Sequence, residues 1–287
     1  MTQTIAITGA TGQLGRLAIA ALKRRAPDAT LVALARDPAR ATDLGVAVRA
    51  FDYSEPAGLG DALAGIDVLV LISSSDFNDR AGQHRNVIAA ARDADAGRIV
   101  YTSILKGFDS PMILAQDHKA TEEALAAAGI PATVLRNGWY TENYTGNLGG
   151  ALAAGAIAGA NPAGRVAPAS RADYAEAIAV VASEDGHGGK VYELAGDAGF
   201  TMPEYAAEVS RQAGRTIPYA PMTEAAYAGM LTGFGLPQGF ASVLADSDAR
   251  AADGALWDDS RTLSRLIGRP TTTLADSVAA ALAPVAA

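Results

Sequence analysis

Three glycines near the N-terminus have the spacing of a loop that binds a phosphate group. Gly9, Gly12 and Gly15 stand at every third position, between an apolar segment and a helical pattern. Gly9 permits a tight turn, Gly12 lets the backbone approach a pyrophosphate, and Gly15 allows close packing of helix and strand. The first N–H groups of the helix would face the anion, which favours this reading over an ordinary glycine-rich turn. The residues expected to contact a dinucleotide are Gly9, Ala10, Thr11, Gly12, Gln13 and Leu14.

The end of the second apolar segment indicates which dinucleotide is bound. Proteins that bind NAD usually place Asp or Glu there, where it accepts hydrogen bonds from the ribose hydroxyls. In this chain Ala35 occupies that position and Arg36 follows it. A guanidinium matches a 2′-phosphate in charge and in the geometry of its donors, so we predict a preference for NADPH. The alternative is that Arg36 is a solvated loop cation that pairs with Asp37.

Polar residues also follow three later apolar segments, where the strands of a doubly wound parallel sheet bind ligands. Asp52 could approach the adenine, and the hydroxyls of residues 73–75 could line the ribose and phosphates on the nicotinamide side. The latter residues are Ser73, Ser74 and Ser75. A further segment ends in Tyr, Thr and Ser at 101–103. The alternative is turn chemistry, because Ser and Asp are favoured in such loops.

The proton-transfer pair of many carbonyl reductases is absent. In that pair a lysine four residues after a tyrosine lowers the pKa of the tyrosine. None of the nine tyrosines here has a lysine at that distance. Reduction of a quinone needs little acid from the enzyme, because a hydroquinone anion is a far weaker base than an alkoxide. The enzyme mainly positions nicotinamide C4 against the acceptor ring. The absence of the pair therefore favours a quinone over a carbonyl acceptor.

The loop after the sixth strand pattern is rich in aromatic and amide side chains, and we expect it to form a wall of the substrate site. Its predicted cofactor contacts are Asn137, Gly138, Trp139, Tyr140, Thr141 and Glu142. An aromatic face could stack on a flat acceptor or on the nicotinamide, while the alternative is a loop held by its own hydrogen bonds. Tyr140 and Asn137 are the candidates for orienting the acceptor. Further candidates are Lys119 and His118, although Lys119 also suits a solvated helix cation.

The elements that must position these residues alternate between strand and helix patterns. Strands are expected at 5–8, 31–34, 46–48, 68–72, 98–102 and 132–135, and helices at 13–25, 56–63, 81–91 and 114–128. This alternation predicts an α/β fold with a doubly wound parallel sheet. After residue 140 it weakens, with Gly and Pro clustered at 146–168. Helices are then expected at 172–182, 202–213, 224–231 and 274–282, and strands at 191–194 and 216–219. We therefore predict a nucleotide-binding domain over 1–140, to whose sheet later segments return, and a smaller, mostly helical substrate-side region over 141–287.

Composition excludes several classes of function. The 287 residues carry a net charge of −8, which argues against nucleic-acid binding and against a polybasic membrane surface. The absence of cysteine excludes disulfides and thiolate catalysis, and the three histidines lack ligand spacing, so no metal is expected. No signal peptide pattern or apolar run of membrane-spanning length is present. We expect a cytoplasmic protein that does not bind membranes and is a monomer or a homodimer.

Taken together, the motifs resemble the NmrA-like branch of the atypical short-chain dehydrogenase family. The resemblance extends over nearly the whole chain, through residues 7–15, 71–75, 83–88, 101–103, 135–144, 171–174, 190–197 and 263–270. The segments at 135–144 and 263–270 are more specific than the glycine motif. One departure is the segment 41–45, which is shorter than in the family and affects a surface loop on the adenine side.

The resemblance implies an NADPH-binding Rossmann domain and a small C-terminal domain, with a quinone entering the cleft between them and receiving a hydride. It implies cofactor contacts at residues 9–14, Arg36, residues 73–75, residues 137–142 and Arg171, although Arg171 could instead pair with Asp173. Related enzymes of the isoflavone-reductase type use a lysine at the position that Lys119 matches. Two alternatives are a redox-sensing regulator that binds NADP(H) without turnover, and a reductase of another carbonyl or imine substrate that uses Lys119.

Overall fold

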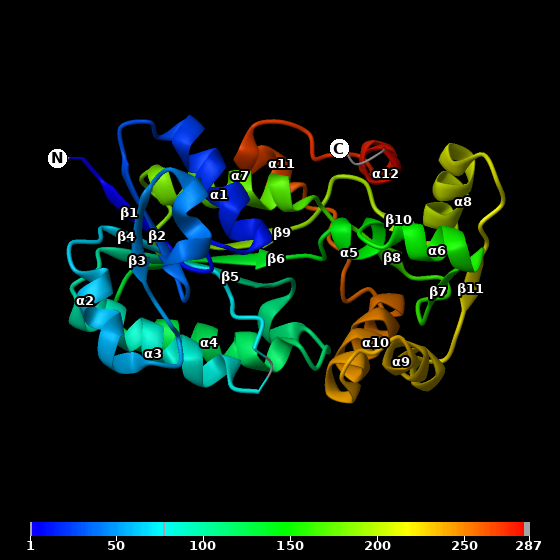
Figure 1. Ribbon diagram of the computed structural model, residues 1–287, viewed down its shortest axis with the longest axis horizontal. Helices are drawn as coiled ribbons and strands as arrows, with labels where there is room; N and C mark the ends of the chain where they lie inside the picture. The colour runs from blue at the N-terminus through cyan, green and yellow to red at the C-terminus, as the bar shows by residue number, and fades with distance from the viewer. Residues whose placement is uncertain (1, 77, 284–287) are drawn as a thin grey trace. The chain divides into compact units, whose positions relative to one another are not determined.

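A seven-stranded sheet forms the centre of the first of the two units of the chain (Figure 1). The computed structural model describes residues 2–76 and 78–283. The strand order is β3-β2-β1-β4-β5-β6-β9, and the neighbouring pairs from β3 to β6 are parallel. The order reverses direction between β1 and β4, which is the switch point of a doubly wound sheet. The predicted α/β Rossmann fold is thereby confirmed.

The sheet belongs to a unit built from three stretches of chain, Met1–Gly107, Gln116–Asn137 and Arg171–Glu193. The third stretch brings helix α7 and most of strand β9 back to the sheet after the chain has left it. The elements of this unit are β1 (Thr4–Ile7), α1 (Gln13–Arg25), β2 (Thr30–Ala35), η1 (Pro38–Leu44), β3 (Ala47–Ala50), η2 (Pro56–Gly58), α2 (Leu59–Leu63), β4 (Val68–Leu71), α3 (Arg80–Asp93), β5 (Arg98–Ile104), α4 (Ala115–Ala127, with its first residue in the second unit), β6 (Ala132–Asn137), α7 (Arg171–Ser183) and β9 (Val191–Leu194, with its last residue in the second unit).

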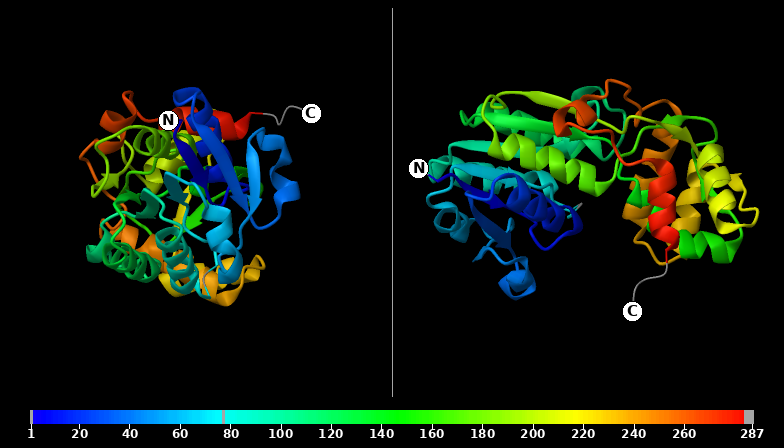
Figure 2. Two further views of the ribbon diagram at one scale, coloured as in Figure 1. Left: turned by 90° about the vertical axis from the view of Figure 1, so that its left-hand side faces the viewer. Right: turned by 90° about the horizontal axis from the view of Figure 1, so that it is seen from above.

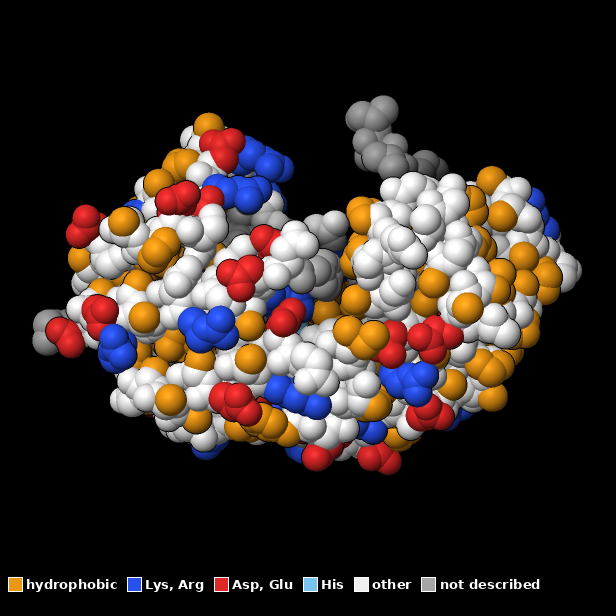
Figure 3. Space-filling model, turned by 90° about the horizontal axis from the view of Figure 1, so that it is seen from below, with side chains coloured by type: hydrophobic (Ala, Val, Ile, Leu, Met, Phe, Trp, Pro, Cys, Tyr) orange, Lys and Arg blue, Asp and Glu red, His pale blue; other side chains and the backbone are white. Residues whose placement is uncertain are grey.

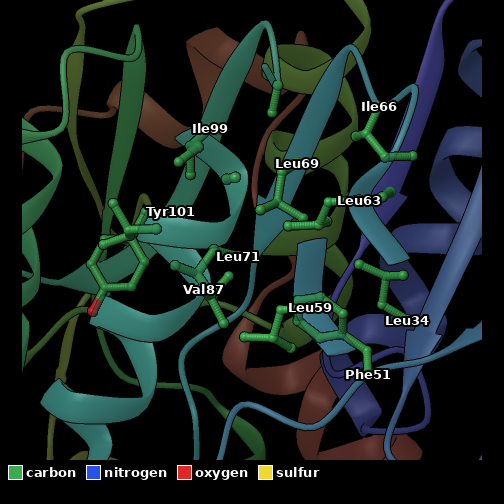
Figure 4. Close-up of a cluster of buried hydrophobic side chains, with 14 of the residues drawn as sticks. Leu34, Phe51, Leu59, Leu63, Ile66, Leu69, Leu71, Val87, Ile99 and Tyr101 are labelled. Atoms are coloured by element: carbon green, nitrogen blue, oxygen red, sulfur yellow. The ribbon is translucent and has the colours of Figure 1, made fainter. Parts of the chain in front are cut away.

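Helices cover both faces of this sheet, with α1 and α7 on one face and α2, α3 and α4 on the other (Figure 1, Figure 2). On the second face, every other residue of a strand points into the core, as the twofold period of a strand requires. Leu69 and Leu71 of β4 lie beside Ile99 and Tyr101 of β5, and they pack against helix residues such as Val87 (Figure 4). The continuous apolar runs of the central strands are therefore explained by burial on both faces.

Helix α1 shows why the sequence pattern predicted its bounds. It begins after Gly12, and its buried residues Leu14, Ala18 and Leu22 recur four positions apart. Its last turn holds three basic residues, which suit the negative end of the helix dipole. The helix packs along α7, so the start of α1 is held rigidly beside the glycine loop.

The second unit consists of Phe108–Ala115, Gly138–Ser170 and Leu194–Ala287 and is mostly helical. Its elements are η3 (Gly107–Asp109, with its first residue in the sheet unit), α5 (Glu142–Thr145), α6 (Leu148–Ala154), β7 (Ile157–Gly159), β8 (Arg165–Val166), β10 (Phe200–Thr201), α8 (Met202–Ala213), β11 (Tyr219–Pro221), α9 (Glu224–Gly233), α10 (Gln238–Ala252), α11 (Thr262–Ile267) and α12 (Leu274–Leu282). The strands pair as an antiparallel β10-β8 ribbon and a parallel β11-β7 pair.

This unit differs from the sequence prediction in several places, of which three have a clear physical reason. The Gly- and Pro-rich segment 146–168 contains α6, β7 and β8, because its short strands are stabilised by partners distant in sequence. The strand expected at 216–219 is shifted to β11. Helix α10 was not predicted, because its buried face carries small or polar residues, among them Ala245, Asp246 and Ser247.

Two further findings concern the surface and length of these elements. On the face shown in Figure 3, side chains of both charges are interspersed. Among the described residues, no helix combines the length and the apolar character that crossing a membrane requires.

Candidate functional site

The glycine loop joins β1 to α1 and has the shape that the sequence predicts. Gly9 has a φ of 59°, a conformation that favours glycine, and its carbonyl accepts a hydrogen bond from the Gly12 N–H at 2.9 Å. A Cβ on Gly15 would lie 2.9 Å from Cα of Ala10 and closer still to the Gly9 carbonyl oxygen. In the described part of the chain, no side chain caps the start of α1. The first N–H groups of this helix thus suit a pyrophosphate, and the loop fits a dinucleotide.

Arg36 is exposed directly after β2, at the edge of the sheet where the glycine loop lies. Asp37 accepts a hydrogen bond from the Ala39 N–H at 3.1 Å and caps η1. Among the described residues no ion pair joins Arg36 to Asp37, and the pairing considered from the sequence is absent. Asp52 accepts two hydrogen bonds from Ser54, and these bonds, with a smaller contribution from the charge of Arg36, lower its pKa. Arg36 is therefore available to a 2′-phosphate.

The serines after β4 have different surroundings. Ser74 donates its hydroxyl to Gln83 Oε1 at 2.7 Å, and its backbone N–H donates to His84 Nε2 at 2.9 Å. The N–H of Ser73 donates to the Thr102 hydroxyl at 2.9 Å. The predicted ligand contact of Ser74 through its hydroxyl therefore competes with an internal hydrogen bond. The hydroxyls of Ser73 and Ser75 donate no such bond to any residue that the structure describes.

The polar side chains at the end of β5 form hydrogen bonds inside the sheet unit. Tyr101 is fully buried, and its hydroxyl lies 2.7 Å from His118 Nδ1 on α4. Ser103 donates to Glu122 at 2.6 Å. Burial is the main cause that lowers the pKa of His118 well below its usual range, so the imidazole is neutral at neutral pH. The neighbouring Lys119 is half-buried on the same helix.

Asn137 ends β6, and its amide distinguishes it from the other candidates. The residue is 4% exposed, and neither side-chain atom has a hydrogen-bond partner among the described residues. Its backbone carbonyl accepts from the Leu105 N–H at 2.9 Å, which fixes the end of the strand. A buried amide without a partner costs about 1–3 kcal/mol, so its donor and acceptor suit the carboxamide or ribose of a bound cofactor.

Residues 138–142 begin the second unit, and backbone hydrogen bonds hold them. The Thr141 N–H donates to the Ala169 carbonyl at 2.9 Å, and the Ala169 N–H donates to the Trp139 carbonyl at 3.2 Å. Tyr140, which forms a bridge with Ala169, and Trp139 are half-buried, as is Glu142. A rigid loop backbone is thus combined with partly accessible aromatic side chains.

Arg171 is the first residue of α7 and is half-buried, two positions before the fully buried Asp173.

A partly buried ion-pair network at the same edge of the sheet was not predicted. Arg136 donates to both carboxylate oxygens of Glu122, at 3.1 and 2.7 Å, and to Glu193 at 2.9 Å. Glu193 also accepts from the Lys106 N–H at 2.8 Å, so the network ties together the ends of β5, β6 and β9. A Cβ on Gly107 would overlap the Arg136 guanidinium. Sequence alone gave no signal for these pairs, because their members are 14 and 57 residues apart.

The parallel sheet brings several candidates to one edge. The ends of β2, β1, β4, β5 and β6 are neighbours, so Arg36, the glycine loop, the serines and Asn137 share that edge. An ideal Cβ on Gly9 would lie 3.6 Å from Cβ of Ile72, which places the serine segment directly beside the glycine loop. Among the described residues no cluster of His, Asp and Glu could hold a metal ion.

Comparisons with known proteins agree with this geometry. A family model described as NAD(P)H-binding matches residues 9–185. Quinone oxidoreductase 2 of Escherichia coli K12 is 52% identical over 277 residues, which cover 96% of this chain and 97% of that protein. The crystal structure of that enzyme with NADPH matches with a TM-score of 0.93, covering 96% of this chain and 99% of that one.

A second solved structure extends the comparison. Triphenylmethane reductase of Citrobacter sp., complexed with NADP(H), is 35% identical and matches with a TM-score of 0.92 over 97% of this chain and all of that one. The chain therefore belongs to the NAD(P)H-binding family, as a relative of quinone oxidoreductase 2.

Proposed function

We propose that this protein is an NADPH-dependent oxidoreductase that reduces quinones by hydride transfer. The observation that carries the proposal is the 52% identity to quinone oxidoreductase 2 over almost the full length of both chains. The glycine loop and the exposed Arg36 at the same sheet edge support it, because they suit the pyrophosphate and the 2′-phosphate of NADPH.

The residues of this chain bind and orient rather than transfer protons. NADPH supplies a hydride when it is bound. The N–H groups at the start of α1 hold the pyrophosphate, and the buried Asn137 amide orients the nicotinamide or its ribose. The quinone gains one hydride and one proton, and water supplies the proton because the hydroquinone anion is a weak base. Burial keeps His118 neutral and raises the pKa of Tyr101, so neither group is tuned for proton transfer near neutral pH.

The first experiment is a measurement of initial rates of NADPH oxidation with and without a small soluble quinone, and with NADH at equal concentration. Quinone-dependent oxidation that prefers NADPH is the expected result. Tight NADPH binding without turnover of any quinone would refute the proposal and would favour a redox-sensing regulator. A folded protein that binds neither nucleotide would refute both functions.

A flat conjugated acceptor other than a quinone is the second candidate. The 35% identity to triphenylmethane reductase and the TM-score of 0.92 favour it. The same assay with a cationic triphenylmethane dye in place of the quinone separates the two acceptors, since bleaching of the dye is visible directly. A higher kcat/KM for the dye would make this class the substrate.

The remaining site roles belong to the same proposal. Tyr140, Trp139 and Glu142 contact the acceptor or cofactor through side chains that their loop leaves partly accessible. Arg171 contacts a cofactor phosphate, while the role of Lys119 is tested by the effect of Lys119→Ala on kcat.

The cysteine-free chain suits a cytoplasmic enzyme. Light scattering after size-exclusion chromatography would distinguish a monomer from a homodimer.

A further inference from the structure

The segment that leaves β4 has three successive backbone N–H groups that all donate to side chains. Ile72 donates to the Thr8 hydroxyl at 2.9 Å, Ser73 to the Thr102 hydroxyl at 2.9 Å, and Ser74 to His84 Nε2 at 2.9 Å. The three acceptors come from the end of β1, from β5 and from α3. A loop held in this way has its direction fixed by side chains from three elements rather than by a turn of its own.

Ser74 is the most strongly held of the three. Besides the N–H bond to His84, its carbonyl accepts from Arg80 Nε at 2.6 Å, and its hydroxyl donates to Gln83 at 2.7 Å. Arg80, Gln83 and His84 all lie in the first turns of α3 and hold the backbone and side chain of one residue. We call these three residues the Ser74 clamp.

His84 can hold Ser74 only as one of its two neutral tautomers. Because Nε2 accepts from the Ser74 N–H, the ring proton must be on Nδ1. Nδ1 lies 2.9 Å from the Thr121 hydroxyl, whose own proton is donated to the Asp117 carbonyl at 2.7 Å. Thr121 is therefore left as an acceptor and selects the Nδ1–H tautomer. The imidazole is fully buried, and burial, with the nearby positive charge of Arg80, lowers its pKa to about 3.

The segment after β4, which the Ser74 clamp holds, lies beside the glycine loop. β1 and β4 are parallel neighbours, and an ideal Cβ on Gly9 would be 3.6 Å from Cβ of Ile72. A shift of the segment would thus reach the glycine loop directly. It would also move Ser73 and Ser75, whose side chains are half-buried and exposed, respectively.

We propose that His84 is a positioning residue for NADPH: through the Ser74 backbone it fixes the segment after β4 in the conformation that the cofactor requires. This inference rests on the proposed function only in its choice of cofactor. His84 touches neither cofactor nor substrate, and it acts through Ser74.

The test compares three variants by direct measurement of the NADPH dissociation constant, without quinone. His84→Leu removes the acceptor and is expected to weaken NADPH binding about tenfold, the effect of losing about 1.4 kcal/mol. His84→Gln places an amide oxygen where Nε2 stands and is expected to stay within about threefold of wild type, because one acceptor replaces another. Thr121→Val leaves the Nδ1–H without its partner and is expected to be intermediate.

The control is His187→Leu. His187 bonds to the Tyr192 hydroxyl through Nδ1 at 2.7 Å and takes no part in the clamp. This variant should bind NADPH as wild type does, and the KM for the quinone should be unchanged in all four variants.

Equal NADPH affinity of wild type and a folded His84→Leu would overturn the proposal. If His84→Leu does not fold, the other two variants decide. Wild-type affinity of Thr121→Val for NADPH would then overturn the proposal. A His84→Gln that binds NADPH as weakly as a weakened Thr121→Val would overturn it too. If His84 had a purely structural role, His84→Leu would have a lower melting temperature but would bind NADPH as wild type does. There would then be no loss of NADPH affinity for His84→Gln to restore. Failure of the wild type to bind NADPH would instead refute the proposed function.

Discussion

Arg36 is the residue that we propose selects NADPH over NADH. Its side chain is exposed, and the carboxylate next to it caps η1 instead of pairing with it. A guanidinium in this position gains charge-assisted hydrogen bonds only from a nucleotide that carries a 2′-phosphate. We therefore expect the preference for NADPH to depend on this one side chain at the end of β2.

Arg36→Ala is expected to raise the KM for NADPH about 10- to 100-fold, which corresponds to the loss of one or two charge-assisted bonds. The KM for NADH should be unchanged, since that nucleotide offers no phosphate at this position. Arg92→Ala is the matched control, because Arg92 is an exposed arginine that pairs with Asp93 at the end of α3. An unchanged ratio of NADPH to NADH efficiency in Arg36→Ala would contradict the assignment.

The buried histidine His84 gives a pH dependence of stability with a defined sign. Its pKa is about 3 in the folded protein against a usual value of 6.5, so below pH 6.5 the unfolded chain binds a proton that the folded protein does not. The contribution is complete above pH 6.5 and is lost as the pH falls towards 3. The slope of this contribution approaches about 1.4 kcal/mol per pH unit.

The measurement is the free energy of unfolding by urea at several values between pH 7 and pH 5. In His84→Gln the slope against pH should be smaller than in wild type by the contribution of one proton. Comparing the two proteins cancels the titration of the groups that do not interact with His84; His118 titrates far below this pH range in both proteins because its burial is the main cause of its lowered pKa. Parallel slopes in the two proteins would show that His84 is not the group responsible.

At the scale of elements, the turn between β1 and α1 depends on the absence of a side chain at Gly15. An added methyl group would overlap the backbone of Gly9 and Ala10. Gly15→Ala is expected to lower the free energy of unfolding by about 1–3 kcal/mol, as overpacking does. Gly60→Ala in α2 is the control, because nothing lies within 4 Å of a Cβ there, and it should be neutral or slightly stabilising. Urea denaturation of both variants tests the comparison, and equal stability would contradict it.

The elements of the sheet unit could be predicted because their patterns are local. A short window of sequence shows the apolar run of β4. It also shows the apolar residues of α1 that recur every four positions, Leu14, Ala18 and Leu22. Helix α10 has no such pattern, since Asp246 lies on its buried face and accepts from the Ile113 N–H of a distant loop. A polar residue that is satisfied by a partner 133 positions away looks exposed in the sequence.

The same reasoning separates the parts of the site. The glycine loop and Arg36 could be proposed as parts of the site from sequence alone, because the chemistry expected of them depends on neighbours along the chain. His84 and Thr121 are 37 residues apart and meet only when α3 and α4 pack on the sheet. The Ser74 clamp and the Arg136 network therefore required the structure.

At the scale of the whole molecule, NADPH binding should stabilise the protein through the sheet unit. A ligand that binds only the folded state at 100 times its dissociation constant adds about 2.7 kcal/mol. A rise of several degrees in melting temperature is expected with NADPH, and a smaller rise with NADH at the same concentration.

Calorimetry is the measurement of choice, because two transitions would show whether the two units unfold separately. In that case NADPH should shift the transition of the sheet unit, and a melting curve insensitive to NADPH would contradict its assignment as the nucleotide-binding unit.

The return of the chain to the sheet has a consequence for biosynthesis. The glycine loop and Arg36 leave the ribosome early, but α7, whose buried residues include Tyr174 and Ile178, and β9, which pairs with β6, are made more than 130 residues later. Until then the face that α7 covers and the free edge of β6 are open to contact with other chains. We therefore expect a nascent chain stalled at residue 140 to bind chaperones and not nucleotide. A purified fragment 1–140 should aggregate, which light scattering would detect.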